Sequence, residues 1–484
     1  MLFNSIQFCI FFAVVTSLFF ALPHRLRWLL LLAASCYFYM AFVPVYILIL
    51  ALIIVIDYGA GILIERAQGR ARKYLLIASL VANIGVLFVF KYFNFVADSI
   101  TGLASLLSQQ PVPDIALRII LPIGLSFHTF QSMSYTIEVY RGHQKAERHF
   151  GIYALYVMFY PQLVAGPIER PQNLLHQFHE RHDFDYQRVT DGLKLMAWGM
   201  FKKVVIADRL AVFVNHIYQS PQNHEGWPLI IATVFFAFQI YCDFSGYSDI
   251  AIGSAQVMGF KLMDNFRRPY FATSIADFWT RWHISLSTWF KDYLYIPLGG
   301  NRVAPWRWWL NLLIVFLVSG LWHGANWTFV IWGALNGLYL IGEIWTQKIR
   351  ARLSSALRLD RVPFLQKTLQ ILVTFALVSF AWIFFRASSL SDAFYITSHL
   401  WPGSSQQGLG ASIRQLGNPI DFGVAVGAII FLMIVEAVQS RGSIRLLVAQ
   451  QPLVVRWVAY YVLVMLIIVF AQITNPIEFI YFQF

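Results

Sequence analysis

The sequence has little charge for its length. Of its 484 residues only 12% are charged, whereas 58% are hydrophobic and 17% are aromatic. A soluble protein carries roughly 25% charged residues, so a chain with half that share cannot cover a water-facing surface. The shortage excludes a soluble enzyme and a disordered protein. It predicts a polytopic membrane protein whose outer surface faces lipid.

Cysteine is also scarce. The three cysteines, Cys9, Cys36 and Cys242, each lie in an apolar run, and none belongs to a C-x-x-C pair. Nothing in this pattern indicates a disulfide framework or a zinc site. The histidine-rich run 176–182 has no evident fourth metal ligand. We therefore expect neither a metal site nor a bound cofactor.

Acidic residues are outnumbered, with 24 against 36 basic ones, and the net charge is +12. In a soluble protein such an excess would suggest a nucleic-acid partner. Here the basic residues gather in short loops between apolar runs, which is how membrane proteins set their topology. We therefore expect no nucleic-acid partner, and we place the basic loops in the cytoplasm.

Long apolar runs are abundant, and a membrane span needs roughly 20 mostly apolar residues. Candidate spans occupy about residues 2–22, 28–43, 45–64, 75–97, 115–137, 193–219, 228–250, 308–322, 326–346, 367–386, 420–440 and 453–474. The apolar stretch 150–166 is shorter and ends among prolines, so we expect a re-entrant or interfacial segment. The predicted fold class is all-α, with about 11–12 transmembrane helices plus re-entrant or interfacial helices.

The loops between the runs alternate in composition. Residues 105–114 and 220–228 contain no lysine or arginine, and the long loop 387–419 contains only Arg414. Strict alternation of these loops with the basic ones places both termini outside.

No internal repeat or low-complexity linker divides the chain. We therefore expect a single membrane domain over residues 1–484. Its parts would be N-terminal spans over about residues 1–140, a core over 150–346 that holds the re-entrant and catalytic segments, and C-terminal spans over 367–484.

Residues 275–298 have apolar side chains at i, i+3, i+4 and i+7 spacing, which predicts one amphipathic helix. Three tryptophans on the apolar side suit a membrane interface, so we expect this helix at the cytoplasmic face. His283 falls off the apolar stripe, and we expect it to face a polar cavity. Spacing alone also allows a histidine that is merely solvated.

Residues 308–345 are nearly all apolar. One helix over this range would be about 57 Å long, nearly twice the hydrocarbon thickness, so the chain must break at Ser319-Gly320 or at Gly324. His323 lies beside that break. An ionisable group inside the membrane is a functional candidate, and burial favours the neutral imidazole that a general base requires.

The helical neighbours of His323 would be Ser319 at i−4, Asn326 at i+3 and Trp327 at i+4. Residues at these spacings share one face of a helix, so we expect them to orient the histidine or to contact substrate. From the residues alone, a structural histidine hydrogen-bonded between helices is an equal alternative.

Further ionisable residues fall within the apolar runs: Asp57, Lys91, Glu138, Asp208, Asp243 and Asp249. A chain of carboxylates can relay protons or ions in a transporter. These residues do not form two matching halves, which many carriers show, so transport is a minor alternative. The serines of 244–249 lack the G-x-S-x-G pattern of a nucleophile elbow.

Two long blocks carry a resemblance to a known family. Residues 277–302, DFWTRWHISLSTWFKDYLYIPLGGNR, and 319–333, SGLWHGANWTFVIWG, resemble the membrane-bound O-acyltransferase superfamily. The blocks similar to its alginate O-acetylation branch are PLGGNR, VAGPIERP (164–171), FSGYSDIAIG (244–253), AWIFFRA (381–387) and the C-terminal FIYFQF. Thr280 departs from the pattern, because a basic residue often stands there.

The resemblance implies a ring-like all-helical body with a central tunnel. It implies that His323 is the catalytic histidine and that His283 is the second histidine of the cytoplasmic motif. It also implies that the donor is cytoplasmic acetyl-CoA and that the acceptor is an exported polysaccharide. Periplasmic or membrane-anchored acetyltransferases would be partner proteins at a bacterial inner membrane.

Basic residues on the predicted cytoplasmic side can attract the phosphates of CoA. Arg281 and Lys291 flank the amphipathic segment and are the preferred candidates. The others are Lys202, Lys203, Arg267 and Arg268. Each charge taken singly can instead serve topology or contact lipid headgroups.

Other functions stay open at this point. The related D-alanyl transferase of teichoic acid export would take its donor from a carrier protein. A non-catalytic conduit for acyl groups or ions would tolerate replacement of His323 by glutamine. A scaffold of a polysaccharide synthase complex would need neither histidine.

Overall fold

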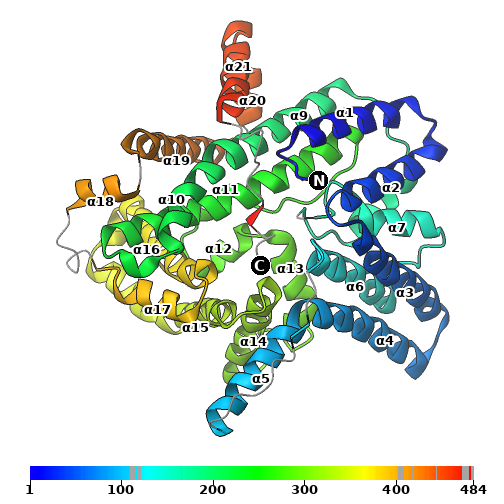
Figure 1. The fold of residues 1–484 in the computed structure, drawn as a ribbon, viewed down its shortest axis with the longest axis horizontal. Helices are drawn as coiled ribbons and strands as arrows, with labels where there is room; N and C mark the ends of the chain where they lie inside the picture. Colours follow the sequence, from blue (N-terminus) through cyan, green and yellow to red (C-terminus); the bar gives the residue numbers. More distant parts are fainter. Residues whose placement is uncertain are drawn as a thin grey trace. The chain divides into compact units, whose positions relative to one another are not determined.

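The computed structural model describes residues 1–108, 116–117, 121–164, 166–401, 408–416, 418–442, 444–470 and 479–480. Within these ranges the regular structure is helical and contains no strand (Figure 1). The chain forms two compact units, each assembled from segments that are far apart in sequence. Unit 1 consists of Met1–Met196 and Tyr247–Met263, and unit 2 of Ala197–Gly246 and Asp264–Ile480. The single domain expected from the sequence stays a prediction, since compactness does not decide whether the parts fold independently.

Each apolar run predicted to span the membrane contains a helix. The helices up to residue 200 are α1 (Ile6–Ala21), α2 (His24–Met40), α3 (Ile47–Arg66), α4 (Gly69–Leu87), α5 (Phe93–Ser108), α6 (Leu125–Arg141), α7 (Phe150–Met158), α8 (Pro171–Leu174) and α9 (Tyr186–Met200). The next are α10 (Asp208–Tyr218), α11 (Trp227–Met258), α12 (Ile275–Arg281), α13 (Ile284–Phe290), α14 (Pro305–His323), α15 (Trp327–Ala356) and α16 (Pro363–Arg386). The last are α17 (Leu390–Ser398), α18 (Leu409–Leu416), α19 (Pro419–Gln439), α20 (Ile444–Ala449) and α21 (Leu453–Phe470).

In the described part of the chain, seven helices are long and apolar enough to cross a membrane. They are Pro44–Arg66, Gly69–Ser108, Trp227–Met258, Trp327–Ala356, Pro363–Arg386, Pro419–Gln439 and Leu453–Phe470. The chain is therefore a multi-pass membrane protein, as its composition predicts. The other expected spans are helical but shorter or more polar.

The short apolar stretch 150–166 contains α7, whose nine residues are almost all buried in unit 1. At 1.5 Å per residue this helix is too short to cross a bilayer. Ala165, residues 109–114 of the lysine-free loop and the last four residues of FIYFQF lie outside the described residues.

Unit 1 buries a carboxylate among neutral donors. Asp57 on α3 is fully buried and accepts hydrogen bonds from Ser79 Oγ (2.6 Å), Ser132 Oγ (2.5 Å) and Asn83 Nδ2 (2.8 Å). These donors come from α4 and α6, which pack against α3. Hydrogen bonds from hydroxyl and amide groups replace the water that a buried carboxylate loses.

Unit 2 buries two carboxylates around one lysine. Lys203 Nζ lies 2.8 Å from Asp208 Oδ1 and 2.8 Å from Asp243 Oδ1. Asp243 Oδ2 also accepts a hydrogen bond from the backbone amide of Ile480 at 2.8 Å. A buried charge is stable only with a partner, so this triad explains three of the ionisable residues in or beside the apolar runs.

Candidate active site

His283 lies at a sharp break between two short helices of unit 2. The single amphipathic helix expected over 275–298 is wrong, because α12 ends at Arg281 and α13 begins at Ile284. His283 itself adopts the left-handed conformation, with φ of 44°. Its ring Nδ1 accepts a hydrogen bond from the Leu286 amide at 3.3 Å, and it thereby caps α13.

The ring of His283 is surrounded by aromatic rings. The side chain is fully buried, with the Phe244 ring centroid 4.6 Å and the Trp322 centroid 6.0 Å away. The expectation that His283 faces a polar cavity is therefore wrong, because the break turns the side chain inward among aromatic rings. Burial lowers the pKa of His283 to about 3, so the ring is neutral near pH 7.

His323 is the last residue of α14, in a second break of the chain. The break expected near this residue lies at Gly324, while Ser319 and Gly320 are inside α14. Asn326 Oδ1 accepts a hydrogen bond from the Thr328 amide at 3.0 Å and caps α15. The helical spacing assumed for Asn326 and Trp327 relative to His323 therefore does not apply, because the helix ends before them.

The two histidines lie close together. Their ring centroids are 6.5 Å apart, with the ring planes at 76°. The His323 side chain is 4% exposed, with Trp322 and Trp332 centroids at 5.0 Å and the Phe385 centroid at 5.2 Å. Two imidazoles within an aromatic enclosure form a site from which bulk water is largely excluded.

Small residues allow α14 and α15 to approach closely. A Cβ atom on Gly333 would lie 2.2 Å from the Phe316 carbonyl oxygen, and one on Gly320 would lie 2.3 Å from that of Phe329. Glycines of this kind permit close helix packing inside a membrane. The position of His323 at the end of α14 depends on this crossing.

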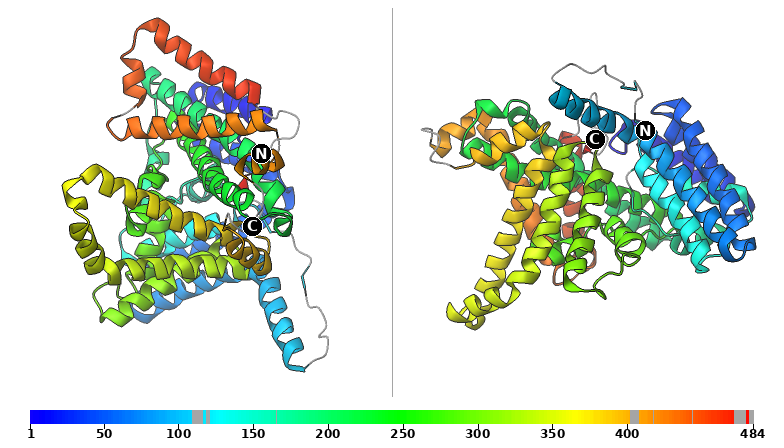
Figure 2. Two further views of the ribbon diagram at one scale, coloured as in Figure 1. Left: turned by 90° about the vertical axis from the view of Figure 1, so that its left-hand side faces the viewer. Right: turned by 90° about the horizontal axis from the view of Figure 1, so that it is seen from below.

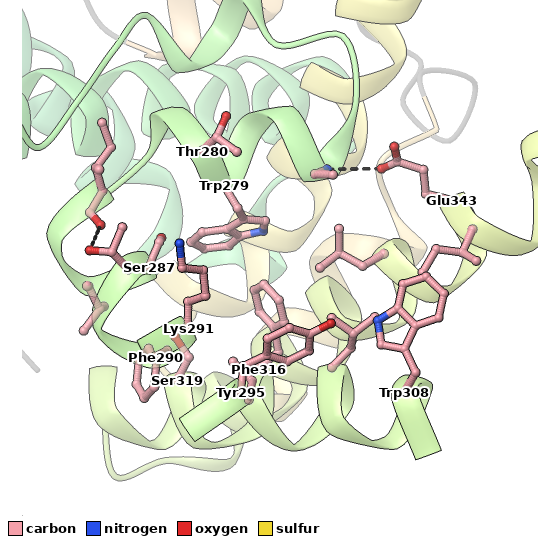
Figure 3. Close-up of a pocket in the computed structure, with 18 of the residues that line it drawn as sticks. Trp279, Thr280, Ser287, Phe290, Lys291, Tyr295, Trp308, Phe316, Ser319 and Glu343 are labelled. Carbon is pink, nitrogen blue, oxygen red and sulfur yellow. Dashed lines mark hydrogen bonds between the residues drawn. The ribbon is translucent and has the colours of Figure 1, made fainter. Parts of the chain in front are cut away.

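Unit 2 contains a pocket of about 620 Å³ (Figure 3). Its lining residues come from α14, from α15 and from residues 276–295, which we call the His283 segment. They include Trp279, Ser287, Lys291, Tyr295, Trp308, Phe316, Ser319, Glu343 and Arg350. Glu343 holds the His283 segment by accepting a hydrogen bond from the Ala276 amide at 3.1 Å. The volume is within the usual range for a small-molecule site.

The pocket contains some of the residues proposed from the sequence. Lys291 and Ser319 line it, and Ser319 is one helical turn before His323. Figure 3 shows the Lys291 side chain directed into the pocket beside Trp279. Among the described residues, His283 and His323 are not part of the lining. The central tunnel stays a prediction.

Other proposed residues lie elsewhere. Arg281 Nε lies 2.7 Å from Asp277 Oδ1, one helical turn away, and does not line the described pocket. Burial raises the pKa of Asp277, but hydrogen bonds from Arg281 and the Thr273 amide outweigh it, so that pKa lies below its usual value. Trp327 is 52% exposed. Substrate contacts of these side chains stay predictions.

Two lysines considered for CoA phosphates are buried. Lys203 is engaged in its ion pairs, and Lys202 Nζ donates to Ser245 Oγ at 2.9 Å. Their side chains are 1% and 4% exposed. The expectation that they attract CoA is therefore wrong, because a phosphate could not reach either ammonium group without disrupting the core of unit 2.

Sequence reasoning missed Asn265, Glu343 and Arg350. Asn265 lies 18 positions before His283, yet its backbone oxygen accepts a hydrogen bond from the Ile284 amide at 3.0 Å. Arg350 lines the pocket from the far end of α15. A periodicity analysis has no signal for such contacts, because they join segments whose spacing follows no regular repeat.

Comparisons with known proteins identify the family and several relatives of the chain. The model of the family described as MBOAT, membrane-bound O-acyltransferase family, matches residues 116–385, which include both histidines. A protein of Pseudomonas aeruginosa named probable alginate O-acetylase AlgI is 38% identical over 443 residues, which are 90% of this chain and 81% of that protein. A protein of the same name from Azotobacter vinelandii is 40% identical over 400 residues, covering 81% of this chain and 76% of that one. A peptidoglycan O-acetyltransferase of Helicobacter pylori is 37% identical over 393 residues, covering 76% of this chain and 72% of its own length.

Proposed function

Because the chain belongs to the membrane-bound O-acyltransferase family, we propose that it takes an acetyl group from cytoplasmic acetyl-CoA and passes it across a bacterial inner membrane to O-acetylate an exported polysaccharide. The names of its relatives support an O-acetyl transfer to a cell-envelope or exported polymer. The observation that carries the proposal is the pair of buried histidine rings, 6.5 Å apart, in the same unit as a pocket with cationic residues in its lining.

The pocket suits the donor. Lys291 and Arg350 are exposed residues that line it, and they can attract the phosphates of CoA from the cytoplasm. The apolar and aromatic lining suits the less polar arm that carries the thioester. Ser319 marks the part of the pocket nearest along the chain to His323.

The transfer itself requires a base. In this proposal His323 removes the proton of the acceptor hydroxyl as its oxygen attacks the thioester carbonyl carbon. The carbon–sulfur bond breaks, CoA leaves as a thiolate, and the thiolate takes up the proton. Trp322, Trp332 and Phe385 around His323 limit water, which would otherwise hydrolyse the donor. Either a sugar hydroxyl or a hydroxyl of a partner acetyltransferase fits this step.

The test is a His323→Ala variant. Removing a general base lowers the rate by about 10²–10⁴-fold, so we expect exported polysaccharide almost free of acetyl esters. Mass spectrometry of the polymer measures this, with equal amounts of wild type and variant in the membrane. His216→Ala is the matched control, because His216 is exposed on α10.

Two outcomes would contradict the proposal at different levels. Full acetylation with His323→Ala would show that His323 is not the base, but it would not contradict the acetyl transfer itself. An unchanged polymer in cells without the chain would remove polysaccharide acetylation altogether. Labelled acetyl-CoA supplied to isolated membranes tests the donor, and no transfer of label would favour a carrier-protein donor, as in the D-alanyl alternative.

A further inference from the structure

One wall of the pocket is aromatic, and it adjoins the surroundings of His323. Trp279 and Phe316 both line the pocket, and their ring centroids are 5.1 Å apart. Trp279 also contacts Trp332, with centroids 5.8 Å apart, and the Trp332 centroid lies 5.0 Å from that of His323. Neither Trp332 nor His323 belongs to the described lining. Trp279 therefore contacts both the pocket and the aromatic enclosure of His323.

The same wall approaches His323 along α14. Ser319 lines the pocket and precedes His323 by one helical turn, so the two side chains share a face of the helix. Phe316, Ser319 and Trp332 are 9%, 5% and 1% exposed, so this end of the pocket is closely packed. Protein interiors of this kind hold few voids, and a larger group fits only if the wall moves. A group that extends from the pocket towards His323 must therefore share its space with these side chains.

We propose that Trp279 and Phe316 limit the length of the acyl group, so that the protein transfers acetyl and excludes longer acyl chains. The inference rests on the proposed function, because it places the thioester of the donor at this wall with its carbonyl carbon directed towards His323. An acetyl group ends one carbon beyond that carbonyl carbon. Each further methylene would need space that the two rings occupy, and a pocket of this kind discriminates by about 10–200-fold per methylene.

Both rings of this wall are carried by anchored backbone. Phe316 lies at the crossing of α14 and α15, where its carbonyl oxygen would be 2.2 Å from a Cβ atom on Gly333. Trp279 is on α12, and Glu343 of α15 holds the start of that helix by accepting a hydrogen bond from the Ala276 amide at 3.1 Å. A wall that limits substrate size must not yield to a larger group, and overfilling a packed site with a fixed backbone is unfavourable. The two anchors meet that requirement.

The main test is a Trp279→Leu variant, which enlarges the site but keeps an apolar side chain at the wall. For the wild type we expect a kcat/KM for butyryl-CoA about 10²-fold below that for acetyl-CoA. In Trp279→Leu the ratio of butyryl-CoA to acetyl-CoA use should rise at least about tenfold.

Trp308→Leu is the matched control. Trp308 lines the same pocket, but it lies near the start of α14, about 22 Å along the helix from His323. Its loss enlarges the pocket away from the proposed wall. Both thioesters should be affected alike, so we expect the ratio between them to stay at the wild-type value.

The measurement is CoA thiol release from acetyl-CoA and from butyryl-CoA, per folded molecule, by membranes that contain the full chain and the acceptors of the cell. Membranes without the chain supply the background. No release from either thioester by wild-type membranes would defeat the proposed function itself. Similar kcat/KM values for the two thioesters in the wild type would overturn this inference alone. A ratio in Trp279→Leu no higher than that in Trp308→Leu would also overturn it.

Phe316→Leu keeps the inference testable if Trp279→Leu does not fold. This change removes less volume at the same wall, so we expect propionyl-CoA to gain about tenfold relative to acetyl-CoA while butyryl-CoA stays a poor donor. A residue with a merely structural role would lower the amount of folded chain without changing the preference between two thioesters. An unchanged preference in folded Phe316→Leu would therefore contradict the size limit.

Discussion

His283 and His323 each lie where one helix ends and another begins, yet the two breaks are built differently. In the first break His283 is itself the cap of α13, through Nδ1. In the second, His323 only ends α14, and a separate residue, Asn326, caps α15. At the first break the histidine itself caps the following helix, whereas at the second break the nearby Asn326 does so.

The difference has a chemical meaning. A ring that caps a helix, as His283 does, has one nitrogen committed to accepting a backbone hydrogen bond. At the second break a neighbour makes the cap, and in the proposed transfer His323 is the base that accepts a proton and returns it. The same residue type, placed 40 positions apart, thus caps one helix and ends another.

The breaks differ in packing as well. α14 and α15 run against each other with glycines at their crossing, and both helices line the pocket together with the His283 segment. Figure 2 shows α15 and α16 continuing together as a yellow helical pair. The second break therefore lies where α14 and α15 cross closely, whereas the first lies between two short helices, α12 and α13.

The largest further effect is expected from breaking the glycine crossing. In Gly333→Ala the new Cβ would meet the Phe316 carbonyl oxygen at 2.2 Å, so the helices must separate. Overpacking of this kind costs about 1–3 kcal/mol, and the displaced His323 should lower the transfer rate. Thermal unfolding in detergent and CoA release measure the two effects. Gly342→Ala on the same helix is the control, since a Cβ there has nothing within 4 Å.

A Gly333→Ala variant as stable and as active as Gly342→Ala would show that close helix contact does not hold the second break. The control should be neutral or slightly more stable, because alanine favours a helix by about 1 kcal/mol over glycine.

The Asn326 cap of α15 can be removed without changing either histidine. Asn326→Ala should cost about 1 kcal/mol of stability and lower transfer only modestly, because α15 loses the acceptor of its Thr328 amide. Asn326→Asp keeps the cap and should resemble the wild type in unfolding and in rate. A large loss of activity in Asn326→Asp would instead point to a substrate contact of the amide, as the sequence-based hypothesis holds.

The smallest effect is expected on the KM for acetyl-CoA when Lys291 or Arg281, the basic residues near the first break, is replaced. Lys291→Ala should raise the KM for acetyl-CoA about threefold, a change below 1 kcal/mol, because the lost charge lines the pocket but is exposed and screened. Arg281→Ala should change KM less, since this side chain is paired with Asp277. Measuring KM at two salt concentrations sharpens the test. A larger effect of Arg281 would place the CoA phosphates outside the described pocket.

Much of the fold was predictable because lipid imposes one rule on every span. Each apolar run contains a helix, and the break near His323 follows from helix length alone. The histidine pair was identified by burial cost and by resemblance. These signals are local, because each of them can be recognised from residues that are close together in the sequence.

The features that sequence reasoning did not predict are tertiary contacts between segments that are far apart in the chain. Periodicity over 275–298 predicted one helix, because the apolar stripe continues across a kink that turns His283 inward. The pattern could not show that Asn265 would hold this kink, nor that Lys203 would pair with Asp208 and Asp243 instead of facing CoA. Such partners are selected by the folded neighbours of each residue.

The Lys203 triad has a consequence for the order of assembly. One of its carboxylate oxygens, on Asp243, is bonded to the backbone amide of Ile480, a residue made 237 positions later. The ribosome therefore delivers the lysine and both aspartates long before that amide exists. This part of the protein can reach its final hydrogen bonding only after nearly all of the printed sequence has been synthesised, so its completion is a late event by construction.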